Sequence, residues 1–180
     1  ASDVYKRQGI GLAHNWGDAF GNVIKDNFLL RCGHHGIYSD GRTGYLLVKG
    51  NWCVECGWNY SPEIRGFPYE SDDARGIGIH VARDFVVLVE NVVLDSLLPC
   101  GLALGMRHGH AFIVGNFLDG LGIWIKERGY ILRNRIEGFA NLSPDGELMM
   151  VGNSCQGLRA HGRDVWIVHN LFSRGKKCFI

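Results

Sequence analysis

The 24 residues from Ile113 to Ile136 read IVGNFLDGLGIWIKERGYILRNRI and contain the same six-residue pattern twice. In each copy an aliphatic residue stands three positions before an asparagine, and an apolar residue stands two positions after it. The two asparagines are Asn116 and Asn134. A pattern that returns within so short a distance is typical of a repeat protein, in which each repeat packs on the next.

The pattern occurs seven times along the chain, and all fourteen flanking positions are apolar. With 46% of the chain hydrophobic, chance does not explain this agreement. The anchors are Asn27, Asn51, Asn91, Asn116, Asn134, Asn153 and Asn170. The residues before them are Ile24, Val48, Leu88, Ile113, Ile131, Met150 and Ile167, and those after them are Leu29, Cys53, Val93, Leu118, Ile136, Cys155 and Phe172.

A second element follows most anchors: a glycine and then alternating apolar residues, as in Gly101-Leu102-Ala103-Leu104. This alternation is typical of a short strand with one face turned inward. The anchors are 24, 40, 25, 18, 19 and 17 residues apart, which allows three short strands and three turns per repeat. A leucine-rich repeat and an antiparallel sandwich fit less well, because the leucine spacing and recurring hairpin signals are missing.

From Gly9 to Ile180 the sequence resembles the right-handed parallel β-helix family, the pectate-lyase-like fold. The resemblance implies an all-β, single-stranded solenoid of about seven to eight coils, with a ladder of asparagines between the second and third strand of each coil. Stacked asparagine side chains can hydrogen-bond to their equivalents about 4.8 Å above and below. We therefore expect the seven asparagines to be structural.

Both ends of the chain are predicted to be truncated. Residues 1–8 include Asp3-Val4-Tyr5-Lys6-Arg7-Gln8, which resembles the translation of a transposon end used to prepare sequencing libraries, so we treat them as a non-native leader. At the other end, Lys177-Cys178-Phe179-Ile180 is predicted to stop inside a strand, with no polar segment to cap the solenoid. We expect further coils of the parent chain as the natural neighbours of residues 9–180.

Composition narrows the classes of partner. The net charge of +1 shows no basic excess for nucleic acid, and no apolar run approaches the roughly 18 residues of a membrane span. Glycine is abundant (26 residues) and proline rare (4), as expected for a β fold with many tight turns. A secreted or cell-surface location is expected from the fold.

The outward face of the first strands is the predicted binding surface. Counted from the glycine that opens each first strand, offsets two and four point outward. Offset two gives Tyr38, His80, Ala103, Trp124, Ala140 and Arg159, and offset four gives Asp40, Ala82, Gly105, Lys126, Leu142 and His161. Aromatic rings stack on sugars and cations pair with uronate carboxylates, so this face suits an acidic polysaccharide. A merely solvated face is the alternative.

The longest insertion, residues 57–76, joins a third strand to the next first strand and is rich in aromatic and acidic residues. In the resembled family this turn forms a wall of the substrate groove, which makes Trp58 and Tyr60 candidates for sugar contact. Arg107 and His108 fall in a turn beside a first strand and join Trp124 and Arg159 as predicted substrate-binding residues.

The resemblance implies a polysaccharide lyase or a glycoside hydrolase. In uronate lyases of this fold a basic side chain removes the proton beside the carboxylate. Tyr38, Asp40, His80, Lys126 and His161 are therefore the candidate catalytic residues. We expect no cofactor, because Asp40 is the only carboxylate in the predicted stripe and supports a Ca²⁺ site weakly. The alternative is a non-catalytic scaffold, such as an adhesin or a phage tail segment that binds glycans.

The cysteines are expected to stack in the core. Cys53 occupies the inward position held by Val93 and Leu118 in other repeats, and Cys56 stands at the same offset as Cys32. A zinc or redox role for Cys53-x-x-Cys56 is the alternative. A disulfide between Cys32 and Cys56 is also conceivable in a secreted protein.

Overall fold

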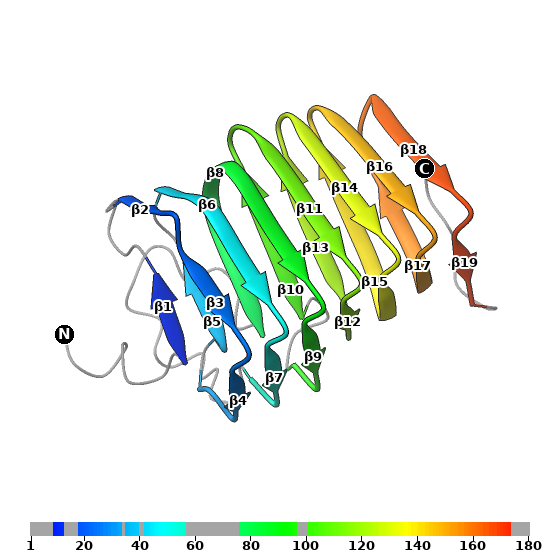
Figure 1. Cartoon of the computed structure of the whole chain (residues 1–180). Coiled ribbons are helices and arrows are strands. Elements are labelled where there is room, and N and C mark those ends of the chain that lie inside the picture. The colour runs from blue at the N-terminus through cyan, green and yellow to red at the C-terminus, as the bar shows by residue number, and fades with distance from the viewer. Residues whose placement is uncertain are drawn as a thin grey trace, which may run out of the picture.

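The computed structural model describes residues 9–12, 18–33, 35–39, 42–56, 76–96 and 101–173; for Asp18, Ala19, Arg42, His80 and Val81 it describes the backbone alone. Within these ranges every regular element is a strand and every strand pairing is parallel. The chain winds through three sheets and returns to the first, which confirms the predicted parallel β-helix (Figure 1).

The first sheet runs along the side of the helix that carries the predicted binding face. Its strands are β1 (Ile10–Leu12), β5 (Ile37–Ser39), the beginning of β8 (Ile77–Val89), β10 (Leu102–Met106), β13 (Leu121–Ile125), the end of β15 (Arg135–Pro144) and the end of β17 (Ser154–Ala160).

The second sheet is turned toward the viewer in Figure 1. Its strands are β2 (Asp18–Phe20), β3 (Val23–Lys25), β6 (Arg42–Lys49), the end of β8, β11 (His110–Val114), β14 (Arg128–Leu132), β16 (Glu147–Val151) and β18 (Asp164–Val168).

The third sheet has the shortest strands. They are β4 (Phe28–Leu30), β7 (Trp52–Val54), β9 (Val92–Leu94), β12 (Phe117–Leu118), the beginning of β15, the beginning of β17 and β19 (Leu171–Phe172).

The core consists of aliphatic side chains stacked coil on coil. Leu88, Ile113 and Ile131 are paired in register in the second sheet and are fully buried. Val93 and Leu118 form the corresponding stack in the third sheet. Because burying one such side chain stabilises the fold by about 1.5–3 kcal/mol, this repeated pattern is the main source of stability.

Each asparagine of the ladder follows a residue in the left-handed conformation. The seven residues that precede the asparagines have φ between 51° and 65°: Asp26, Gly50, Glu90, Gly115, Arg133, Gly152 and His169. Such a residue bends the chain sharply between the second and third sheets, and only glycine adopts this φ without steric cost. Glycine fills three of these seven positions.

The asparagine side chains form one continuous hydrogen-bonded column. The Nδ2 of each asparagine from Asn27 to Asn153 donates to the Oδ1 of the next asparagine at 2.9 or 3.0 Å. The same Oδ1 accepts the backbone N–H of the preceding asparagine at 2.8–3.1 Å. The column therefore satisfies the polar groups of a buried turn and holds adjacent coils in register.

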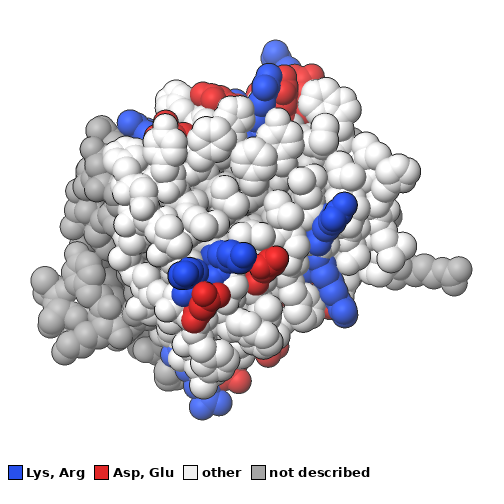
Figure 2. All heavy atoms as spheres, viewed as in Figure 1, with Lys and Arg blue, Asp and Glu red and all other residues white. Residues whose placement is uncertain are grey.

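The middle of the outer face of the second sheet is apolar. Phe85, Phe112 and Tyr130 stack with ring centroids 6.2 and 4.9 Å apart. Figure 2 shows this face as a broad surface without charged side chains, between two groups of charged ones. The described residues contain no helix long and apolar enough to cross a membrane.

Candidate functional site

The outer face of the first sheet, here called the first-sheet face, carries two rows of side chains. Register places six residues of successive strands in the first row: Tyr38, Gly78, Ala103, Gly122, Asn141 and Arg159. The second row contains Gly105, Trp124 and Ser143. His161 takes the next position in this row, because its backbone N–H donates to the Leu142 carbonyl at 2.8 Å and so continues the parallel pairing. The middle of this face therefore carries small residues, of which Gly78 and Ala103 are buried and Gly105 and Gly122 are partly exposed.

The register corrects part of the predicted stripe. Gly101 aligns with Gly76, Gly120 and Phe139, whereas the prediction counted from Gly78, Gly122 and Gly138. A shift of two residues keeps a side chain on the same face, so Trp124 still points outward and is 40% exposed. Lys126, however, lies just past the end of β13, in the turn to the second sheet.

For the coil that begins at Phe139 the error was one residue, which reverses the face. Ala140 and Leu142 were predicted to point outward and instead lie fully buried in the core. Asn141 and Ser143 take the outward positions. Ala82 was also predicted to point outward and is buried, because a register shift interrupts the pairing of β8 with β10 between Leu104 and Met106.

Trp124 and Lys126 lie in one coil, and Arg159 and His161 lie two coils further on. The Lys126 ammonium lies 5.4 Å from the centre of the Trp124 ring, within reach of a cation–π interaction. Arg159 Nε donates to His161 Nε2 at 2.9 Å. Two strand steps separate the coil of Trp124 from that of His161, or about 10 Å. This stretch presents one aromatic ring and two cationic side chains on the same exposed surface.

Tyr38 lies at the other end of the first row. Its ring stacks on the buried His35 ring, with centroids 4.4 Å apart and planes 16° from parallel. Three strand steps, about 14 Å, separate its row position from Gly122 in the coil of Lys126. The structure therefore does not bring Tyr38 together with Lys126 or His161.

Several predicted residues cannot be placed. Asp40, Trp58 and Tyr60, with nearly all of the 57–76 insertion, lie outside the described residues. His80 lies in strand β8, and its side chain is outside the description. Among the predicted catalytic and substrate-binding residues whose side chains are described, Arg159 and His161 are joined by a hydrogen bond.

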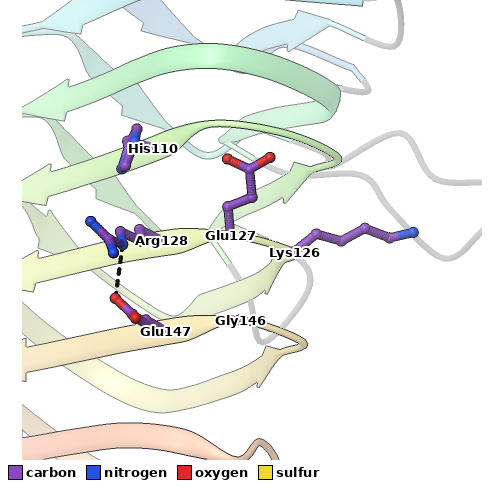
Figure 3. Close-up of a pocket in the computed structure, with 6 residues that line it drawn as sticks. All are labelled: His110, Lys126, Glu127, Arg128, Gly146 and Glu147. Atoms are coloured by element: carbon purple, nitrogen blue, oxygen red, sulfur yellow. Dashed lines mark ion pairs between the residues drawn. The ribbon is translucent and has the colours of Figure 1, made fainter.

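A second polar cluster lies in the turns that join the first sheet to the second. His110, Lys126, Glu127, Arg128, Gly146 and Glu147 line a shallow hollow there (Figure 3). Arg128 Nε lies 2.8 Å from Glu147 Oε2, and His108 Nδ1 lies 3.3 Å from Glu127 Oε1. Figure 3 shows Lys126 extending away from the other side chains. The exposed Arg107 precedes His108 in the same turn.

Glu127 is held in its ionised form. The backbone N–H of Gly109 lowers the pKa of the Glu127 carboxyl, with further lowering by His108 and His110. A general acid that protonates a glycosidic oxygen needs the opposite shift. Glu127 is therefore suited to accepting hydrogen bonds from a ligand and poorly suited to donating a proton.

The sequence prediction missed Glu127, Arg128 and Glu147 as neighbours in space. One feature of the sequence could have revealed them: each strand of the second sheet in this part of the chain begins with a polar residue. The parallel register places these residues side by side, and they are His110, Arg128, Glu147 and Asp164. Within the described ranges no three His, Cys, Asp or Glu side chains are grouped so that they could hold a metal ion.

Comparison with known proteins adds no relative: no family model, no curated protein and no solved structure matches this chain.

Proposed function

We propose that this chain is a glycan-binding β-helix of a secreted or cell-surface protein, and that it holds an acidic polysaccharide along the first-sheet face. The observation that carries the proposal is the stretch with Trp124 and Lys126 on one coil and Arg159 and His161 two coils further on. It offers a ring for stacking and two cations for carboxylates, spaced along the axis of a long face.

The shape of the face supports an extended ligand. Gly105 and Gly122 are small and partly exposed beside the cationic coils, whereas Gly78 and Ala103, nearer Tyr38, are buried. The face from Tyr38 to Arg159 spans five strand steps, or about 24 Å, which is long for a small metabolite. The apolar second-sheet face lacks charged groups in its middle and is a poorer match for a polyanion.

Calorimetric titration with oligomers of galacturonate, with neutral oligomers of the same length as the comparison, tests the proposal. We expect the acidic oligomers to bind more tightly. Replacing Arg159 with alanine should lower the affinity for the acidic oligomers about ten- to a hundredfold, because a charge-assisted hydrogen bond contributes about 1.5–3 kcal/mol. Trp124→Ala should lower the same affinity roughly tenfold.

Matched controls come from other faces of the helix. Trp52 on the third sheet and Trp166 on the second are 49% and 47% exposed, similar to Trp124. Alanine at either position should leave the affinity unchanged. Equal losses for Trp52→Ala and Trp124→Ala would mean that the ligand is not held on the first-sheet face.

A β-eliminating lyase is the second candidate, and the contact between Arg159 and His161 favours it. A uronate carboxylate that binds the Arg159 guanidinium would take it away from His161 Nε2, and this nitrogen would then be free to remove the adjacent proton. Incubation with pectin, alginate and glycosaminoglycans should then release unsaturated uronides, detected by their ultraviolet absorbance. Absence of this product, together with retained binding, would leave the binding function alone.

A further inference from the structure

Cys32 and Cys56 occupy the same position in adjacent coils. Leu30 of β4 pairs with Val54 of β7, and each cysteine stands two residues beyond its strand partner. The Arg31 N–H donates to the Val54 carbonyl at 3.0 Å, so the stacking continues past the strand ends. A separation of one coil, about 4.8 Å, falls within the Cα separation that a disulfide spans.

The thiol of Cys56 is directed across the coil boundary toward the coil of Cys32. Cys56 Sγ lies 3.6 Å from the carbonyl oxygen of Val54 in its own coil and 3.7 Å from that of Leu29 in the coil of Cys32. It is also close enough to Cys32 to shift the pKa of that thiol. The sulfur of Cys56 is therefore directed at the neighbouring coil and at its partner cysteine.

The two cysteines differ in reactivity. The hydrogen bond from Cys56 lowers the pKa of the Cys32 thiol to about 7 and, in turn, raises the pKa of Cys56. Cys32 is partly exposed, whereas Cys56 is fully buried. A thiolate that is formed near neutral pH and open to solvent is the nucleophile in thiol–disulfide exchange.

We propose that Cys32 and Cys56 form an inter-coil disulfide by exchange with a low-molecular-weight disulfide such as oxidised glutathione. The Cys32 thiolate attacks one sulfur of the small disulfide, whose bond breaks and releases the first small thiolate. The Cys56 sulfur loses its proton to solvent and attacks Cys32 in the mixed disulfide, which releases the second. The protein is oxidised by two electrons and one small disulfide is reduced to two thiols.

The other described cysteines do not compete for this role. Cys53 lies fully buried in the third-sheet stack, and burial raises its pKa to about 12. Cys155 occupies the corresponding core position four asparagine anchors later. Cys100 and Cys178 lie outside the described residues.

The bond would tie together two coils and fix the chain at Cys56, the residue before the 57–75 segment. Closing a loop of about 24 residues removes conformations from the unfolded chain. From the usual dependence of such stabilisation on loop length, the thermal midpoint should rise by roughly 5–10 °C on oxidation.

The full chain can be equilibrated in buffers of graded glutathione ratio, acid-quenched, alkylated with N-ethylmaleimide and mapped as peptides. We expect Cys32 and Cys56 to lose alkylation together and to appear in one linked peptide, with the rise in thermal midpoint. In reduced protein the alkylation rate of Cys32 should reach half its plateau near pH 7. Full alkylation of both cysteines in the most oxidising buffer would overturn the proposal.

Two variants separate this pair from its neighbours. In the Cys56→Ala variant the exchange should stop at a mixed disulfide between Cys32 and glutathione. The pH midpoint for alkylation of Cys32 should move toward that of an ordinary thiol. Cys53→Ala should form the linked peptide as the wild type does. An internal disulfide at Cys32 in the Cys56→Ala chain would show that another cysteine is the partner and would sink the assignment.

Discussion

At the scale of single residues, the asparagine column explains why this side chain recurs and no other. The Asn116 Oδ1 accepts both the N–H and the Nδ2 of Asn91, while its Nδ2 donates to the Leu88 carbonyl and to Asn134 Oδ1. Aspartate lacks the donors and would stack like charges. An amide of this length meets every demand of the buried turn.

Replacing Asn116 with alanine should lower the free energy of unfolding by about 2–5 kcal/mol, because buried groups of Asn91 and Leu88 lose their partners. Urea denaturation measures the change. The control is Asn27→Ala: among the described contacts Asn27 donates to Asn51 and Lys25, and the loss should be below about 1 kcal/mol. Equal losses at the two positions would contradict a cooperative column.

The residue before each asparagine makes a separate prediction. Gly115 has φ of 63°, and a Cβ there would meet no heavy atom closer than 4.0 Å, at Glu90 Cγ. Gly115→Ala should therefore cost only the left-handed penalty, about 1–2 kcal/mol. Arg133→Gly, at the same place in the next coil with φ of 53°, should change stability in the opposite direction. Thermal denaturation of the two variants compares the signs.

At the scale of elements, the turns differ from one another far more than the strands do. Between β12 and β13 only Asp119 and Gly120 connect the third sheet to the first, and Asp119 accepts the Ser96 N–H at 2.6 Å. Burial raises the pKa of the Asp119 carboxyl, partly opposed by that hydrogen bond. A short turn here places an ionisable group against the core.

Because the folded pKa of Asp119 is raised, its contribution to stability is fully present below the unfolded pKa, near 3.8, and is lost as the pH rises through the folded value. Asp119→Asn keeps an acceptor for Ser96 and removes this dependence. Relative to the wild type, the variant should gain stability between pH 3 and pH 8, as measured by urea midpoints across that range. If the difference in urea midpoint between the two proteins stayed constant across this pH range, the pKa of Asp119 would not be raised in the folded protein.

The turns also explain which predictions succeeded. The asparagine pattern identified the fold because its chemistry is local and repeated in every coil. The first-strand register was harder to predict, because Phe139 stands where other coils have glycine and the turn lengths are unequal. A one-residue error there moved Ala140 and Leu142 to the wrong face. The contact of Arg128 with Glu147 joins residues 19 positions apart and needed the three-dimensional register.

At the scale of the whole molecule, the three sheets present different surfaces to solvent. The second sheet has stacked aromatic rings along its middle and charged residues such as Arg128 and Glu147 at its strand starts, and the third is short and bordered by ion pairs such as Arg31 with Glu55. The first-sheet face combines small residues with the exposed Trp124 and with cationic side chains. The net charge of +1 means that attraction of a polyanion must come from this local arrangement.

The central claim is best tested by titrating the full chain with uronate oligomers of increasing length. We predict that affinity rises with length until the oligomer spans the face from Arg159 to Tyr38, about 24 Å, and that Arg159→Ala weakens every member of the series. Neutral oligomers of equal length should bind more weakly. Affinity that is independent of length, or equal for neutral and acidic oligomers, would contradict binding of an acidic polysaccharide along this face.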